Sequence, residues 1–158
     1  MKDTKSWQYP GPSVSVQDVH AFGRELGMAI PEDVVWFLTE IGNGGRPDPE
    51  VVFDFVEDGR PEGAIVHGLL GINHPDQNYD LGSDLRSDVF SIIFNKAFPL
   101  GFDTGNNCFM YIFAGPDAGQ VHFVAFDEFA VRDKSPRTWK ICNSIQEFAA
   151  HIQAAMGD

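Results

Sequence analysis

The sequence predicts an α+β fold: a mostly antiparallel sheet of about four to six strands with helices packed around it. Apolar residues recur at helical spacing near both ends of the chain and alternate at period two in several segments between them. The expected order of helices, strands, a helix, strands and a final helix favours an antiparallel sheet. We expect a polar lead-in over residues 1–14 and a single domain over residues 15–158.

The first helix is expected directly after the lead-in. Ser15 suits its N-cap, Asp18 follows at the capping-box position, and Gly27 ends it. A second helix should follow closely, and two short helices so near in sequence are expected to pack as neighbours.

The second helix is predicted over residues 31–41, where both ends are marked. Pro31 suits the first helical position, and two acidic residues follow it in the first turn. Phe37 and Leu38 lie on the apolar face, so they are predicted core residues. The stretch Gly42-Asn43-Gly44-Gly45 ends the helix, because such residues tolerate positive φ.

The middle of the chain changes to strand periodicity. Residues 50–56 and 64–72 are expected to form an antiparallel hairpin around a turn at residues 57–63. A loop is expected at residues 73–82. Residues 84–94 favour a helix, although a strand competes over the last five of them.

The last third predicts a second hairpin and a final helix. Residues 98–107 are interpreted as a glycine-bearing connection, and strands are expected at residues 108–113 and 120–127. A short stretch at residues 130–132 would extend the sheet. Asn143 or Ser144 is expected to cap the final helix, and Glu147 completes a Ser-x-x-Glu capping box.

Composition excludes several classes of partner. Eleven basic and 23 acidic residues give a formal charge of −12, which disfavours nucleic acid and anionic membranes and suits a basic partner. The N-terminal residues lack the apolar segment of a signal peptide, and no apolar run is long enough to span a bilayer. We therefore expect a cytoplasmic protein.

No catalytic, cofactor or metal site is predicted. The glycine-rich stretch after residue 41 follows a helix end, whereas a phosphate-binding loop precedes a helix start. Asp103, Asn106 and Asn107 resemble half of a cation-binding loop but lack its spaced acids, so a turn is favoured. The five histidines show no metal-ligand spacing, and Cys108 and Cys142 lie in or beside apolar stretches typical of inert thiols.

Negative charge is concentrated in the middle of the chain. Residues 47–95 contain ten acidic residues against two arginines, whereas four basic residues gather near the last helix: Arg132, Lys134, Arg137 and Lys140. We predict that the acids near the first hairpin turn bind a partner: Asp54, Glu57, Asp58 and Glu62. The alternative is a solvated rim that only aids solubility.

Two short motifs resemble those of the SUKH superfamily, which includes the yeast cell-wall-assembly regulator family and many bacterial immunity proteins. The first motif comprises Ile30, Pro31, Glu32, Asp33, Phe37, Leu38, Asn43, Gly44 and Gly45. The second comprises Pro99, Leu100, Gly101, Phe102 and Asp103, with Gly105 and Asn106. The resemblance covers roughly residues 15–152.

The resemblance implies an α+β fold and a non-catalytic protein-binding role. Bacterial members are mostly immunity proteins that neutralise a toxin, often a nuclease or a deaminase. By similarity, the partner of this short acidic chain would be a cognate protein toxin with a basic surface. The alternative that the resemblance leaves open is a regulatory or scaffold module of the cell-wall-assembly regulator type.

Overall fold

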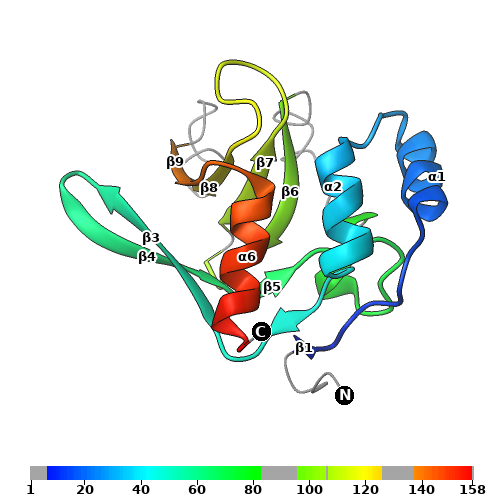
Figure 1. The fold of residues 1–158 in the computed structure, drawn as a ribbon, viewed down its shortest axis with the longest axis horizontal. Coiled ribbons are helices and arrows are strands. Elements are labelled where there is room, and N and C mark those ends of the chain that lie inside the picture. The colour runs from blue at the N-terminus through cyan, green and yellow to red at the C-terminus, as the bar shows by residue number, and fades with distance from the viewer. Residues whose placement is uncertain (1–6, 83–95, 106, 126–136, 158) are drawn as a thin grey trace.

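The computed structural model describes residues 7–82, 96–105, 107–125 and 137–157 (Figure 1). These residues confirm the predicted α+β class and the mostly antiparallel sheet. The main sheet has five strands in the order β5-β6-β7-β8-β9, all antiparallel to their neighbours. Their bounds are Gly68–Leu69, Ala97–Phe102, Cys108–Ile112, Val121–Ala125 and Arg137–Cys142.

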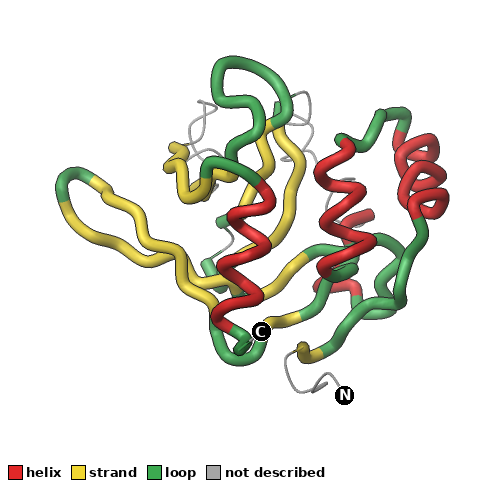
Figure 2. Tube along the Cα trace, viewed as in Figure 1, coloured by secondary structure: helices red, strands yellow, loops and turns green. Residues whose placement is uncertain are grey.

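Two smaller sheets and several helices complete the described part of the chain (Figures 1 and 2). Strand β1 pairs with β2, and β3 pairs with β4. Their bounds are Trp7–Gln8, Arg46–Pro47, Val51–Glu57 and Arg60–Val66. The helices are α1 (Val16–Leu26), α2 (Glu32–Trp36), the π-helical turn η2 (Phe37–Ile41), the 3-10 turn η3 (Gln77–Tyr79) and α6 (Ile145–Ala155).

Helix α1 has the predicted caps. The Ser15 hydroxyl accepts a hydrogen bond from the Asp18 N–H at 3.1 Å, and the Asp18 carboxylate accepts one from the Ser15 N–H at 2.9 Å. Gly27 closes the other end in the left-handed conformation, at φ 73°. Both helix ends are therefore determined by local sequence.

The second predicted helix differs in two respects. Pro31 is the N-cap of α2 and not its first helical residue, and the last turn is π-helical from Phe37 onward. The Thr39 hydroxyl donates to the Val35 carbonyl at 2.9 Å, which is the acceptor that the Thr39 N–H would use in a regular α-helix. Phe37 and Leu38 are buried, as expected of core residues.

The first hairpin has a much shorter turn than the seven residues predicted. Asp58 and Gly59 alone connect β3 and β4, with φ of 51° and 78°. Asp-Gly is a preferred two-residue hairpin turn, and Pro61 and Gly63, which favour a longer turn in the sequence, lie within β4. The predicted strand 64–72 is also wrong as a unit, since β4 ends at Val66 and β5 pairs with β6.

The predicted connection at residues 98–107 is wrong in its first half, because β6 occupies residues 98–102. Phe98 and Leu100 are buried in this strand, which lies between β5 and β7. The register shifts between Pro99 and Gly101, so a bulge accommodates the strand-breaking residues. A side chain at Gly101 would lie 2.6 Å from the Gly68 carbonyl oxygen, so glycine permits the close approach of β5.

The second predicted hairpin is formed by β7 and β8, and β9 was not predicted. Burial of β9 is uneven along its length, and most of the contacts that define it come from β8. The predicted segments at residues 84–94 and 130–132 lie outside the described residues. Within the described residues, no helix is long and apolar enough to cross a membrane.

The core lies between the main sheet and the helices. Phe148 of α6 packs against Phe37 of η2 and Phe109 of β7, with ring centroids 5.8 and 6.1 Å apart. All three side chains are fully buried. The final helix, whose N-cap is Ser144, therefore joins the N-terminal helices to the sheet.

Candidate functional site

The four predicted binding acids lie on the β3–β4 hairpin, which projects from the helices and the main sheet (Figure 1). Strand alternation places them on different faces. Asp54 lies on the outer face, while Glu57 and Glu62 lie on the inner face with Phe55. Asp58 lies in the turn.

Arg137 of β9 contacts two of these acids. Its Nη2 atom lies 3.0 Å from Glu57 Oε1 and 3.8 Å from Asp58 Oδ2. Asp54 and Glu62 are exposed and form no ion pair within the described chain. The hairpin thus presents two acids to solvent and shares two with Arg137.

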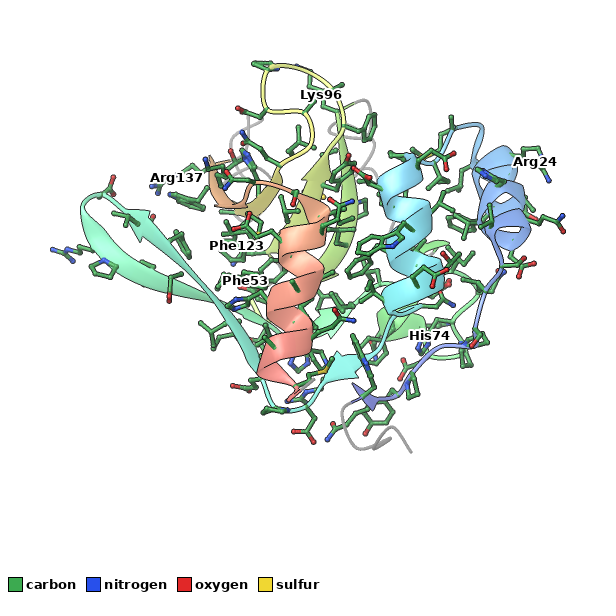
Figure 3. All side chains as sticks on the ribbon, in the orientation of Figure 1. Arg24, Phe53, His74, Lys96, Phe123 and Arg137 are labelled. Carbon is green, nitrogen blue, oxygen red and sulfur yellow. The ribbon has the colours of Figure 1, made fainter. Side chains whose placement is uncertain are left out.

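Aromatic contacts hold the distal half of the hairpin against the sheet. The Phe55 ring lies 5.2 Å from Trp139 and 5.5 Å from Phe123, centroid to centroid. Arg137 also lies over the Trp139 ring at 4.9 Å. Figure 3 shows Arg137 and Phe123 on the side of the sheet near the hairpin. Together with the ion pair, these contacts fix the direction in which the hairpin projects.

The base of the hairpin is held by α6. Phe53 stacks on Phe148, with centroids 4.9 Å apart, and lies 4.4 Å from the His151 ring. His151 Nε2 donates a hydrogen bond of 2.7 Å to the Val52 carbonyl. Strand β9 and helix α6, which are both distant from the hairpin in sequence, therefore support it.

The first motif forms a structural junction. Asn43 is buried, and its amide donates to the Pro12 and Ile72 carbonyls at 2.9 Å and accepts from the Ile72 N–H at 2.8 Å. Gly44 and Gly45 follow with φ of 84° and 117°, and a side chain at either would meet nearby backbone atoms. This arrangement joins the lead-in, η2 and the loop after β5.

The second motif is equally structural in its geometry. Gly101 and Phe102 end β6, and the Asp103 carboxylate closes the following turn. It accepts hydrogen bonds from the N–H groups of Gly105 and Asn107 at 2.8 and 2.9 Å. The Asp103 carboxylate thus accepts hydrogen bonds from its own loop, as expected of a residue that stabilises a turn.

Asp33 links three elements. Its carboxylate accepts a 2.7 Å hydrogen bond from the Tyr111 hydroxyl of β7 and a 3.3 Å bond from the Gln146 amide of α6. Burial, followed by this hydrogen bond and the negative charge of Asp33, raises the pKa of Tyr111 to about 12. Tyr111 therefore remains a hydroxyl donor across the physiological range.

The described residues contain no group of three His, Cys, Asp or Glu side chains that could hold a metal ion. Cys108 and Cys142 are buried free thiols, and burial, then the charge of Glu147, raises the pKa of Cys142 to about 12. A reactive thiolate is thus disfavoured at Cys142.

A cleft of about 580 Å³ lies between the lead-in and the loop after β5. His74 lines it, but both ring nitrogens are used. The Nδ1 atom accepts from the Asp76 N–H at 3.0 Å, so Nε2 donates to the Tyr9 carbonyl at 2.8 Å. His74 therefore fastens Tyr9 to the loop after β5 and offers no free group for chemistry.

Sequence reasoning missed the residues that support the hairpin. Arg137 was noted only as part of a basic cluster, and Trp139 was not noted at all. Lys140 also lies on β9, whereas Arg132 and Lys134 lie outside the described residues. The available signal was the alternation of Trp139 and Ile141 with polar residues at 137–142.

Comparison with known proteins agrees with these motifs. A family model described as the SMI1 / KNR4 family (SUKH-1) matches residues 13–151. No curated protein and no solved structure matches significantly. Because the model covers most of the sequence, from the lead-in to α6, the chain belongs to the SMI1/KNR4 family (SUKH-1).

Proposed function

We propose that this protein is a non-catalytic binding module, an immunity protein that neutralises a cognate bacterial toxin of the nuclease or deaminase type in the cytoplasm. The projecting acidic hairpin β3–β4 is the observation that carries the proposal. Its turn end extends beyond the helices and the main sheet, so a partner can approach both strands there (Figure 1). The chain's formal charge of −12 favours a basic partner.

The mechanism would be stoichiometric blocking. A basic surface that binds nucleic acid in the toxin would instead meet Asp54, Glu57, Asp58 and Glu62. These carboxylates lie on or beside a hairpin that is held in place by Phe55 and Arg137. Association would be steered by charge, because attraction between oppositely charged surfaces raises the rate of encounter.

We expect a toxin domain to be encoded beside this gene, and stopped-flow association with that domain tests the proposal. We expect the quadruple variant Asp54→Asn/Glu57→Gln/Asp58→Asn/Glu62→Gln to associate about tenfold more slowly at low salt. The difference should shrink as salt rises, because charges beyond about 8 Å are screened at physiological ionic strength.

The matched control removes four exposed acids on other elements: Glu25→Gln, Glu32→Gln, Glu40→Gln and Asp117→Asn. It changes the net charge equally, so it should slow association less than the hairpin variant. Equal rates for the two variants would reject steering by the hairpin. No binding of the wild-type protein to that toxin would reject the immunity function and favour the regulatory or scaffold alternative.

A further inference from the structure

We infer that the outer face of hairpin β3–β4 anchors the partner through an apolar patch with one carboxylate at its centre. The outer face is defined by three cross-strand pairs: Val52 with Ile65, Asp54 with Gly63, and Val56 with Pro61. The inference rests on the proposed function and assigns its partner a particular surface. That surface carries apolar side chains around a lysine or arginine.

The first argument is the concentration of exposed apolar side chains. Five large hydrophobic residues are exposed in the described chain, and three of them lie on this face: Val52, Val56 and Ile65. Their relative exposures are 41%, 63% and 42%. Single exposed apolar residues are ordinary, but several gathered on one face of a hairpin and bordered by polar residues point to an interaction site.

The second argument is that this face is rigidly presented. On the opposite face of the hairpin, Phe53 packs against α6 and Phe55 packs against Trp139. The Glu57–Arg137 ion pair lies beyond them, toward the turn. A partner would therefore bind a surface that is already ordered, which reduces the entropic cost of association.

The third argument concerns the chemistry of the occupant. Asp54 lies between Val52 and Val56 along the strand, and its opposite residue, Gly63, has no side chain that could cover it. Removal of this carboxylate from water is costly unless a cation pairs with it. The partner must therefore bring a lysine or arginine to Asp54 while its apolar groups pack on the neighbouring side chains.

Two other occupants fit less well. A symmetric contact between two copies of this face would bring two Asp54 carboxylates and two acidic turns together, which is repulsive. Addition of a partner strand to the free edge of β4 is hindered by Pro61 and by the flanking charges of Arg60 and Glu62. The edge of β4 is thus disfavoured, and we assign the contact to the outer face.

The test measures dissociation from the same toxin domain. The triple variant Val52→Thr/Val56→Thr/Ile65→Thr keeps β-branched side chains on the strands and removes much of their apolar surface. We expect its dissociation rate to rise at least about tenfold with the association rate almost unchanged, because anchors act on dissociation. Asp54→Asn should also speed dissociation, since it removes the partner of the buried cation.

Matched controls lie on α1, on the opposite side of the molecule from the hairpin (Figure 1). Val16→Thr changes a valine that is 49% exposed, and Glu25→Gln removes an exposed acid. Neither should alter dissociation. Thermal melting of each variant verifies that the fold is kept.

The possible failures are distinguishable. If the wild-type protein binds the toxin and the triple variant dissociates at the same rate, the outer face is not the anchor and the proposed function stands. If the wild-type protein does not bind, both are rejected. If sedimentation shows that the wild-type protein is a dimer and the triple variant is a monomer, a second copy covers the face and the inference is wrong.

Discussion

At the residue scale, Asn43 shows how one side chain can join three segments. Its two hydrogen bonds with Ile72 are buried, the third, to Pro12, is partly buried, and the partners lie 29 and 31 positions away in sequence. Gly11 and Gly71 lie next to Asn43 in the fold and leave no room for a side chain. A Cβ atom at either position would overlap the Asn43 carbonyl oxygen. The motif around Asn43 is therefore explained by packing of backbone against backbone.

Replacement of Asn43 by alanine should lower the free energy of unfolding by about 2–4 kcal/mol, because buried Ile72 backbone groups would lose their partners. Urea denaturation of the variant measures this loss. Asn78→Ala is the control, since that side chain is exposed. An Asn43→Ala midpoint equal to that of the control would contradict the structural role.

His122 predicts a pH dependence of stability. Burial lowers the pKa of its imidazole below the ordinary 6.5, and Nε2 lies 2.9 Å from Gln120 Oε1. The unfolded chain therefore binds this proton more readily than the folded one. The contribution of His122 to the free energy of unfolding is complete above pH 6.5. It is lost as the pH falls from 6.5 toward the lowered pKa of the folded state.

Denaturant unfolding between about pH 7.5 and about pH 5 measures this effect. The wild-type protein should lose more stability over this range than His122→Gln, whose amide does not titrate. Parallel stability curves for the two proteins would show that His122 makes no such contribution.

At the element scale, the hairpin β3–β4 depends on contacts that its own sequence does not contain. The Asp58-Gly59 turn and the alternation of β3 are local properties. An isolated two-stranded hairpin is marginally stable in water, so its order comes from the inner-face contacts with β9 and α6.

Phe55→Ala should therefore loosen the hairpin without unfolding the domain. We expect amide hydrogen exchange in β3 and β4 to accelerate by about tenfold or more, while exchange in β7 changes little. Val56→Ala is the matched control, because it alters the next residue on the outer face of the same strand. Equal acceleration by both variants would mean that inner-face packing is not what orders the hairpin.

At the scale of the whole molecule, the C-terminal helix connects parts that are far apart in sequence. It packs against η2 through Phe37 and holds the hairpin base through His151. The acidic hairpin and α1 lie at opposite sides of this core (Figure 1). The core thus acts as a platform from which the hairpin projects.

Much of the fold could be read from local signals. The caps at Ser15, Gly27 and Ser144 and the hairpin of β7 and β8 follow from neighbouring residues. The fold class follows from the periodicities, and the family from two short motifs. These features are determined by interactions within a few residues, so the sequence alone was sufficient.

Other features were decided only by tertiary contact. Strand β6 contains Pro99 and Gly101, which oppose a strand locally, yet burial between β5 and β7 outweighs their propensity. The predicted acids were found by charge, but their division between two faces depends on the register of β3 with β4. The sequence by itself determined helix ends, turns and charge because these are local. Tertiary structure decided which residues support the hairpin, because Trp139, Arg137 and α6 reach it only after the chain has folded.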